Sequence, residues 1–410
     1  MRFSVLLSVA AAAAMAGGYE LPESSINATA LSAAYVAASH GADAAYYNPA
    51  AMVYNEDAGL LEVDTTYIGL SKVNYKGNYT SPFTHATSGP YNIHSQQESF
   101  LVPTLHYSSK KLGNNSARVG LSIVAPAGLS KRWDSQPAKS SAEEFTLQTI
   151  EVNPSFAIPL SDTLSFGAGF RIVRTDGIVK SNTGAPLQIS RDMTGDSIDY
   201  GYNLALNYRP NQNLSLAATY RSKIDLNVEG DATLRTVLPA ASGYDGSTRV
   251  TVPLPAALNL AAAYTFDTET TVEVVYERTY WSAYKSLDFD YDGTVNTGTT
   301  IFGAPIAKNW TNTNTYRLGI TQKMDKLTAM AGVAYDKTPI PEATLGYELP
   351  DSDAWIYSLG ARYQVDKQWN IGIAGLVDVK KSRDVKNTSI DGEFSDSRAY
   401  LVTVGVEYRF

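Results

Sequence analysis

The stretch Ser395–Phe410, SDSRAYLVTVGVEYRF, ends the chain and decides the fold class. From Tyr400 onwards every second residue is aliphatic or aromatic, and the residues between them include Thr403, Glu407 and Arg409. This period of two predicts a strand with one apolar and one polar face. The apolar face is aromatic at both ends and aliphatic between them, which is typical of a strand that crosses a bilayer.

The composition fits a membrane barrel. Charged residues make up 18% of the 410 residues, and tyrosine, which favours strands and membrane interfaces, occurs 27 times. Soluble domains usually carry about a quarter of charged residues. The formal net charge is −8 without any basic run, so we expect no nucleic-acid partner. The absence of cysteine excludes disulfides and thiolate chemistry, and is compatible with an oxidising compartment.

Residues 1–16 have the features of a secretory signal peptide. A positive charge at Arg2 precedes an apolar run that ends at Ala14, and Ala14 and Ala16 supply the small residues of an A-x-A cleavage site. The run is shorter than the roughly 20 residues that an anchor helix needs. We therefore predict a mature chain that begins at Gly17 and is exported.

The mature chain divides into two regions. Residues 17–57 are rich in Ala, Ser and Asn, and Pro49 ends any helix at or before Asn48. This segment is too small to form its own core, so we expect it to pack into something larger. From Ala58 to Phe410 the period is two, and no further domain boundary is visible. The predicted strands begin near Val63, Phe100, Ala117, Phe145, Leu164, Tyr200, Leu214, Leu258, Val272, Tyr316, Leu327, Trp355, Trp369 and Tyr400.

The predicted connections alternate between short and long. Short turns lie at 210–213, 267–269 and 366–368, and long loops at 74–98, 131–144, 228–249 and 288–312. Short turns on one side and long extracellular loops on the other are typical of outer-membrane barrels. The prediction is an all-β, transmembrane, antiparallel β-barrel of about 14 strands over residues 58–410, an even number as in bacterial single-chain barrels. A soluble sandwich or solenoid is the alternative.

In such a barrel the apolar faces meet lipid and the polar faces line the lumen. The charged residues on the polar faces are Arg171, Arg221, Glu273, Glu277, Arg317, Arg362, Glu407 and Arg409. They could hold a plug through ion pairs, or they could form a solvated, charge-balanced channel wall. A barrel of this size leaves a pore unless something fills it. We expect residues 17–57 to fill the lumen.

Several motifs, in their order along the chain, resemble the FadL family of outer-membrane transporters for hydrophobic molecules. The motifs are Gly18-Tyr19-Glu20-Leu21 at the mature N-terminus, Asn48-Pro49-Ala50, Ala125-Pro126-Ala127-Gly128 with Trp133 after it, Asn309-Trp310-Thr311, Tyr316-Arg317-Leu318-Gly319, Gly332-Val333-Ala334-Tyr335-Asp336, Thr338-Pro339-Ile340-Pro341 and Leu349-Pro350-Asp351-Ser352-Asp353. Each motif is short, but together they span essentially the whole mature chain.

The resemblance implies a barrel closed by an N-terminal hatch, residues 17–57, and a passive route for long-chain fatty acids or aromatic and aliphatic hydrocarbons. Ligand is captured among the outer loops, moves to an internal apolar pocket and leaves sideways through a kink in the third strand. The hatch and gate residues are then Asn48, Pro49, Ala50, Gly120, Pro126 and Gly128. Pro126 cannot donate to a ladder, and Gly120 and Gly128 loosen the same strand.

The predicted ligand-binding residues flank the loop after the third strand. Leu129, Trp133, Phe145 and Leu147 are apolar residues around an otherwise polar loop, and Val237–Ala241 form a second apolar run. Exposed apolar residues like these need a partner, which is either another loop or a hydrophobic ligand. Lys131 and Arg132 could hold an anionic head group, stay solvated or touch lipopolysaccharide. The choice between a fatty acid and a neutral hydrocarbon stays open.

The rival functions are a nonspecific porin or surface adhesin, and an outer-membrane hydrolase. The sequence has no G-x-S-x-G, H-E-x-x-H or P-loop pattern, so we expect no enzyme, no catalytic site and no cofactor. His85 and His94 share a long loop, but two loop histidines are more often solvated than metal-bound, so we expect no metal.

The expected partners follow from a location in the bacterial outer membrane. They are a hydrophobic small molecule, membrane lipid with lipopolysaccharide, and the outer-membrane assembly machinery, and we expect a monomer. Chains that resemble this one end in Phe, so Tyr408 and Phe410 are the predicted assembly signal. Alternatively, Phe410 is one more anchor at the membrane interface.

Overall fold

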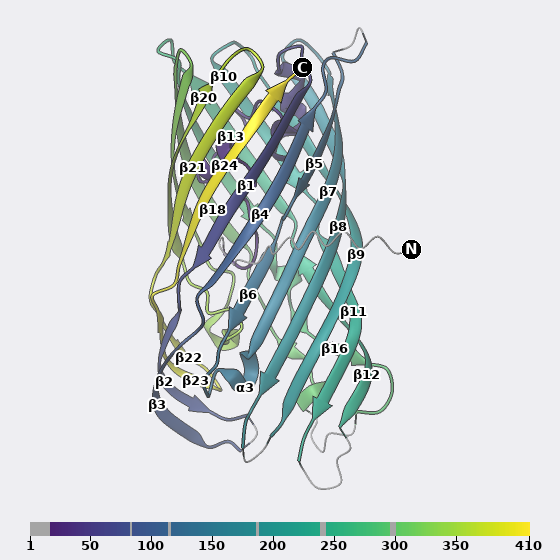
Figure 1. The fold of residues 1–410 in the computed structure, drawn as a ribbon, viewed down its shortest axis with the longest axis vertical. Coiled ribbons are helices and arrows are strands. Elements are labelled where there is room, and N and C mark those ends of the chain that lie inside the picture. The colour runs from purple at the N-terminus through teal and green to yellow at the C-terminus, as the bar shows by residue number, and fades with distance from the viewer. Residues whose placement is uncertain (1–16, 83, 114–115, 186–187, 238–242, 296–300) are drawn as a thin grey trace.

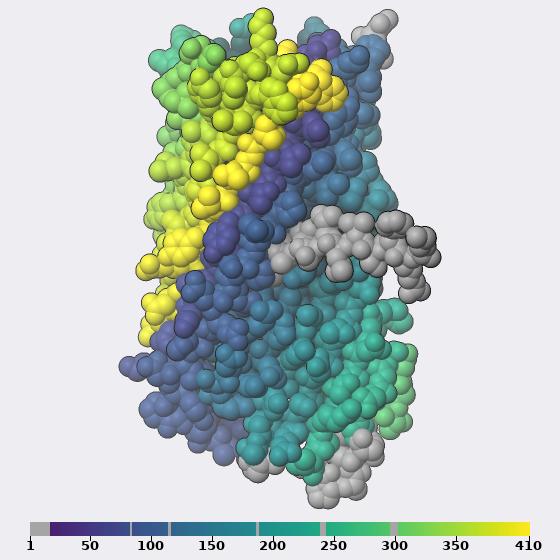
Figure 2. Space-filling model, in the orientation of Figure 1, coloured from purple at the N-terminus to yellow at the C-terminus, as the bar shows by residue number. Residues whose placement is uncertain are grey.

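The computed structural model describes residues 17–82, 84–113, 116–185, 188–237, 243–295 and 301–410. These residues form a closed antiparallel barrel of 14 strands, as predicted. The first strand, β1 (Leu60–Leu70), pairs with the second, β4 (Glu98–Ser108), and also with the last, β24 (Arg398–Arg409), which closes the wall. Figure 2 shows this seam, where yellow β24 lies against purple β1. The predicted signal peptide, residues 1–16, lies outside the described residues.

Most strands of the wall run in one piece. Besides β1, β4 and β24, they are β7 (Glu144–Pro159), β8 (Leu164–Asn182), β9 (Ser190–Tyr208), β14 (Thr270–Thr279), β18 (Thr313–Met324), β19 (Leu327–Asp336), β20 (Ala354–Gln364) and β21 (Trp369–Lys380). The others are interrupted, namely β5 (Arg118–Val124) with β6 (Gly128–Arg132), β10 (Leu214–Arg221) with β11 (Ile224–Arg235), and β12 (Tyr244–Leu254) with β13 (Ala257–Thr265).

The remaining elements lie inside the barrel or at its ends. A separate four-stranded sheet contains β2 (Asn74–Thr80), β3 (Thr87–His94), β22 (Arg383–Lys386) and β23 (Ile390–Ser395). Shorter elements are β15 (Ser286–Leu287), β16 (Phe289–Tyr291), β17 (Ile306–Ala307), α3 (Lys139–Ala142), η2 (Trp281–Ala283), η3 (Ile301–Gly303) and η4 (Glu342–Thr344). The N-terminal segment carries α1 (Ile26–Ala30), α2 (Ala44–Tyr47) and η1 (Pro49–Tyr54). It lies at the same end of the barrel as the C-terminus, and the four-stranded sheet lies at the other end (Figure 1).

The outer face of the wall carries the apolar band that the period of two predicts. On β24, Val402 and Val404 are 46% and 48% exposed, whereas Thr403 between them is buried and faces inward. On β9, Tyr200, Tyr202 and Leu204 likewise point outward. An apolar surface of this extent needs a lipid solvent rather than water.

One predicted loop is wrong, because most of residues 228–249 belongs to the hairpin of β11 and β12, which pair from Ile224–Leu254 to Leu234–Tyr244. The reason is that the polarity of the two faces is inverted there. Val228 and Leu234 point inward and are buried, while Glu229 and Asp231 on the outer side are exposed. At this end of the barrel water lies outside and an apolar space lies inside, so the lipid-facing pattern does not apply.

Small residues let the hatch, residues 17–57, pack directly on the wall. A Cβ at Gly360 of β20 would lie 2.5 Å from Cβ of Ala30, and a Cβ at Gly372 of β21 would lie 2.9 Å from the Ile26 side chain. Because real Cβ contacts are longer than this, only glycine gives the hatch its close approach.

Charged side chains of the lumen bind the backbone and side chains of the hatch. The N–H groups of residues 36–38 all donate to the carboxylate of Glu273, over 2.6–3.1 Å. Arg362 Nε donates to Asn27 Oδ1 over 2.6 Å, and Glu407 accepts the N–H of Ala42 over 3.0 Å. These contacts agree with the alternative in which the charged residues of the lumen hold a plug, rather than form a solvated channel wall.

Candidate functional site: an apolar cavity beneath an interrupted strand

The third strand of the wall is interrupted at residues 125–127, between β5 and β6. β5 pairs with β4 only from Gly120 to Ile123, and β6 pairs with β7 but forms no ladder with β4 in the described part of the chain. Pro126 lies in the middle of the interruption and has no N–H to offer to a neighbouring strand. The wall therefore lacks its backbone ladder between β4 and the second half of the third strand.

The first hatch residues occupy this interruption. Leu21 N–H donates to the carbonyl of Pro126 over 3.0 Å, Gly128 N–H donates to the carbonyl of Tyr19 over 2.9 Å, and Glu20 lies opposite Ala127 in an antiparallel bridge. The hydroxyl of Thr149 on β7 bonds both backbone groups of Ala127. The N-terminal segment thus supplies the backbone partner that the wall lacks at this point.

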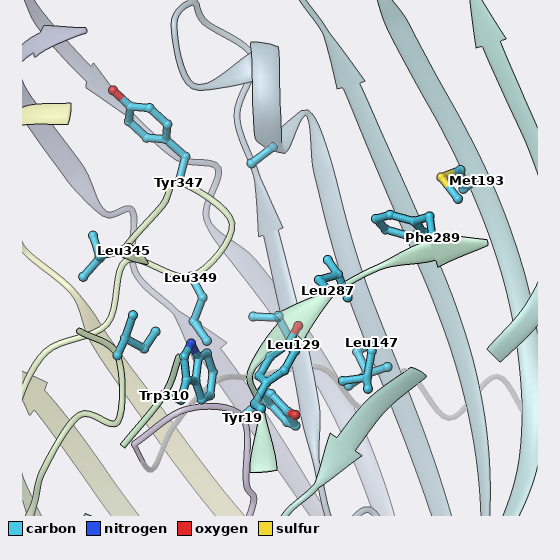
Figure 3. Packing of buried hydrophobic residues seen from close by; sticks show 14 of the residues in the cluster. Tyr19, Leu129, Leu147, Met193, Leu287, Phe289, Trp310, Leu345, Tyr347 and Leu349 are labelled. Carbon is cyan, nitrogen blue, oxygen red and sulfur yellow. The ribbon is translucent and has the colours of Figure 1, made fainter. Parts of the chain in front are cut away.

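An apolar cavity with about 840 Å³ of empty space, part of it open to solvent, lies on one side of this segment. The aromatic and large aliphatic residues that line it are Tyr19, Leu129, Phe145, Leu147, Val179, Met193, Val228, Val250, Val252, Tyr284, Leu287, Phe289, Trp310, Ile340 and Leu349. They come from the hatch, the wall and the long connections. Figure 3 shows Tyr19 and Trp310 beside each other with Leu349 close by, and their rings lie 5.7 Å apart. An apolar lining of this kind suits a hydrophobic small molecule.

A second cavity, with about 810 Å³ of empty space, lies beneath the interruption and is lined by Pro126, Glu20 and Leu21. Tyr19 lines the first cavity and Glu20 the second, so the segment 19–21 lies between them. The Tyr19 ring is held by an edge contact with Trp281 at 4.7 Å between ring centroids. Burial raises the pKa of the Glu20 carboxyl well above its usual range, and the neighbouring acid Glu277 raises it further.

Lys308 and Glu348 are the charged residues among the described side chains that line the first cavity. Lys308 Nζ lies 2.5 Å from Glu348 Oε1, so each neutralises the other. Burial raises the pKa of the Tyr284 hydroxyl, and the nearby Glu348 carboxylate raises it further. The phenol is therefore neutral, and the cavity presents no net charge from its described lining.

The structure places the predicted ligand residues in two groups. Leu129, Phe145 and Leu147 line the first cavity. Trp133 lies outside its lining and is fully buried under the loops, where its Nε1 donates to the carbonyl of Tyr347 over 2.9 Å. Trp133 thus takes the alternative role of loop packing.

The predicted head-group cations, Lys131 and Arg132, are likewise outside the lining of the described cavity. Arg132 forms ion pairs with Glu144 at 3.0 Å and with Glu98 at 3.4 Å. Lys131 is buried. The cation that does reach the cavity is Lys308.

The predicted hatch residues lie together against the wall. Asn48 Nδ2 donates to the Val36 carbonyl at 2.8 Å and to Asn207 Oδ1 at 3.0 Å, which ties the hatch to β9. Pro49 begins η1, and the carbonyl of Ala50 accepts a hydrogen bond from Ser165 of β8 at 2.9 Å.

The predicted gate residues of the third strand are divided by the structure. Gly128 directly follows the interruption, and Pro126 is within it. Gly120 instead lies within the ladder of β5, opposite Ser155, and makes room for Ala45 and Met52 of the hatch. Its place indicates hatch packing rather than a role in the kink.

Other predicted features lie elsewhere. The apolar run Val237–Ala241 falls outside the described residues from 238 onwards, and Val237 is exposed. His85 and His94 are exposed, and the described residues contain no cluster of metal-binding side chains. Within the described ranges, no helix has the length and apolarity to cross a membrane.

Sequence reasoning missed Tyr19, Lys308, Trp310 and Glu348 as cavity residues. Tyr19 and Trp310 belong to motifs that resemble the family, so a signal was present, although without a role for either residue. Lys308 and Glu348 are distant in sequence and lie in connections, where no periodicity indicates what a side chain faces. Only the fold of these connections brings them together.

The closed wall and the outward apolar band define a β-barrel of the bacterial outer membrane. The sequence matches the family described as outer membrane protein transport protein (OMPP1/FadL/TodX) over residues 7–410, and the chain belongs to this family.

Relatives of this family have similar sequences and folds. The long-chain fatty acid transport protein of Escherichia coli (strain K12) is 25% identical over 355 residues, which cover 75% of this chain and 77% of the relative. Outer membrane protein P1 of Haemophilus influenzae is 25% identical over 402 residues, covering 87% and 84%. The crystal structure of a Pseudomonas aeruginosa FadL homologue superposes with a TM-score of 0.82 at 21% identity, covering 96% and 99%. That of the P. putida toluene transporter TodX gives 0.71 at 18% identity, covering 94% and 99%.

Proposed function

We propose that this protein carries hydrophobic small molecules passively across the outer membrane. Ligand enters from the long-loop, extracellular side and binds in the apolar cavity lined by Tyr19, Leu129 and Trp310. It then passes the segment 19–21 and leaves sideways into the membrane at the interruption around Pro126. No energy-coupling motif is recognisable in the hatch, so the concentration gradient drives the transfer.

The observation that carries this proposal is the position of residues 19–21. They separate the two cavities and pair with the interrupted strand. A lateral path therefore needs only a short segment to move, while the rest of the hatch stays bound through Glu273 and Arg362. Displacing the segment breaks few backbone hydrogen bonds, each of which contributes about 1 kcal/mol.

The names of the relatives agree with an apolar cargo, because they include a fatty acid transport protein and a toluene transporter. The outward apolar band supports the sideways exit, since a hydrophobic molecule that leaves there enters lipid rather than water. The hatch is bonded to the wall inside the lumen, which is unfavourable for a nonspecific porin that needs an open channel.

A reversible disulfide across the interruption tests the lateral route. Glu20 and Ala127 lie directly opposite each other in a bridge, and the natural chain has no cysteine. The double variant Glu20→Cys/Ala127→Cys should form a disulfide, because directly opposed residues of an antiparallel pair come close enough for one. We expect the oxidised protein to lose uptake of radiolabelled butylbenzene into cells, and the reduced protein to recover it.

The single variants Glu20→Cys and Ala127→Cys are the matched controls and should transport equally with and without reductant. Undiminished uptake by the oxidised double variant would show that residues 19–21 need not move, and the lateral route would fail. A large single-channel conductance of the intact protein in a planar bilayer would favour the porin alternative instead.

A further inference from the structure

We infer that the apolar cavity selects uncharged molecules over ionised carboxylates, and that Glu348 determines this selectivity. The inference rests on the proposed function and names its substrate class: neutral hydrocarbons and other uncharged apolar molecules, rather than fatty acid anions. It starts from the charges inside the cavity.

The cavity holds a cation that is already paired. Lys308 Nζ and Glu348 Oε1 are 2.5 Å apart, and their side chains are 5% and 19% exposed. A ligand carboxylate that reached Lys308 would have to replace Glu348, which would then remain largely buried without a partner. Burying a carboxylate without a compensating partner is unfavourable, so the exchange brings no net gain.

The surroundings of the pair hold Glu348 in this position. A Cβ at Gly346 would collide with the Glu348 carboxylate, so the absence of a side chain there lets Glu348 fold back over its own turn. Thr344 Oγ1 donates to the Lys308 carbonyl over 2.6 Å, and Lys308 N–H donates to the Lys285 carbonyl over 2.8 Å. The two chain segments that carry the ion pair are thus tied to each other.

Arg191, a cation behind the cavity lining, is covered by aromatic rings. The guanidinium of Arg191 lies over Phe289 at 4.7 Å and over Phe302 at 5.2 Å from the ring centroids. Phe289 lines the cavity, whereas Arg191 is not among its described lining residues. A ligand in the cavity therefore meets the apolar ring and not a free guanidinium, while Lys131 and Arg132 lie outside the lining as well.

A binding experiment with ligands of matched size tests the inference. The purified wild-type protein, reconstituted in lipid nanodiscs, is dialysed at neutral pH against radiolabelled butylbenzene, methyl 4-phenylbutanoate and 4-phenylbutanoate, with protein-free nanodiscs as the blank. The ester and the acid share a skeleton and differ in charge. We expect both neutral ligands to bind at least about tenfold more tightly than the anion.

The variant Glu348→Gln removes the anion and leaves Lys308 unpaired. We expect its affinity for 4-phenylbutanoate to rise about tenfold, because the ligand carboxylate can now pair with Lys308. Butylbenzene binding should be unchanged. The matched control is Glu342→Gln, the same substitution at an exposed position of η4 in the same connection. It should leave all three affinities unchanged.

Equal binding of the ester and the anion by the wild type would overturn the inference, and so would an unchanged ester-to-anion ratio in Glu348→Gln. The comparison within the wild type decides the matter even if the variant does not fold. Failure of the proposed function gives a different result: none of the three ligands binds, and the disulfide of the Glu20→Cys/Ala127→Cys variant leaves uptake unaltered. If the ester and the anion bind equally while the disulfide of Glu20→Cys/Ala127→Cys blocks uptake, the selectivity is refuted and the proposed function is not.

Discussion

Gly167 of β8 shows how single residues of the wall determine the fit of the hatch. A Cβ at this position would collide with Ala50 N and lie 2.7 Å from the carbonyl carbon of Pro49. The Asn48-Pro49-Ala50 motif therefore packs against a wall position that tolerates no side chain. Backbone atoms cannot move aside as the end of a flexible side chain can, so the cost of added volume falls on the hatch as a whole.

We expect Gly167→Ala to destabilise the seated hatch by about 1–3 kcal/mol, the usual cost of overpacking. The measurement is single-channel conductance in a planar bilayer, which should show more frequent or larger openings than the wild type. Gly375→Ala on β21 is the matched control, because a Cβ there meets its nearest neighbour only at 3.9 Å. Identical conductance of both variants would mean that the close packing at Ala50 does not keep the lumen closed.

At the scale of elements, the third strand is held firmly in the wall and yet has no ladder along part of one edge. A continuous strand could not combine the two. β5 fixes the strand to the wall through β4 and β7, while β6 pairs with β7 and leaves the β4 side without a ladder. Pro126 separates the two pieces, and residues 19–21 pair with the interruption. At this place in the described wall a segment of the hatch, rather than a neighbouring wall strand, supplies the backbone partner.

We expect Pro126→Ala to lower the uptake of radiolabelled butylbenzene several-fold at equal surface abundance. Alanine restores an N–H and relaxes the backbone angle, so the strand can become more regular and narrow the exit. Pro154→Ala, a proline within the wall strand β7, is the control and should transport like the wild type. Undiminished uptake by Pro126→Ala would mean that proline itself is not needed for the opening.

At the scale of the whole molecule, the barrel depends on the seam between its first and last strands. Phe410 N–H donates to the Gly59 carbonyl over 3.0 Å, and Gly59 N–H donates to the Phe410 carbonyl over 2.9 Å. The Phe410 ring is 60% exposed and stacks near Tyr408, with 6.0 Å between ring centroids. Its side chain faces outward at the short-turn end, where it is accessible from outside the barrel.

Deleting Phe410 separates the predicted assembly signal from a mere interface anchor. We expect the shortened chain to refold in detergent micelles but to assemble poorly in cells, seen as loss of the heat-modifiable band in gel electrophoresis. Phe266→Ala is the control, since Phe266 is 49% exposed and precedes a predicted short turn. Normal assembly of the shortened chain in cells would leave Phe410 only the role of an anchor.

The sequence alone was sufficient to predict the barrel and much of its wall. The alternation in Tyr400–Phe410 predicted the outward face of β24, and the absence of an independent core in residues 17–57 predicted that they pack inside something larger. It also predicted Leu129, Phe145 and Leu147, which line the cavity. These features follow from the period and composition of short stretches of sequence, which can be read without knowing the tertiary structure.

Other features were decided only by the tertiary structure. A period of two shows which residues share a face, but not whether lipid, water or an apolar cavity lies beside it. Val228 and Leu234, in a predicted loop, are therefore found facing inward. Lys308 and Glu348 pair because closure of the barrel brings two connections together. The position of Tyr19 between the two cavities likewise depends on where the hatch meets the third strand. Contacts between residues far apart in the chain carry no local pattern, so only the closed barrel determines them.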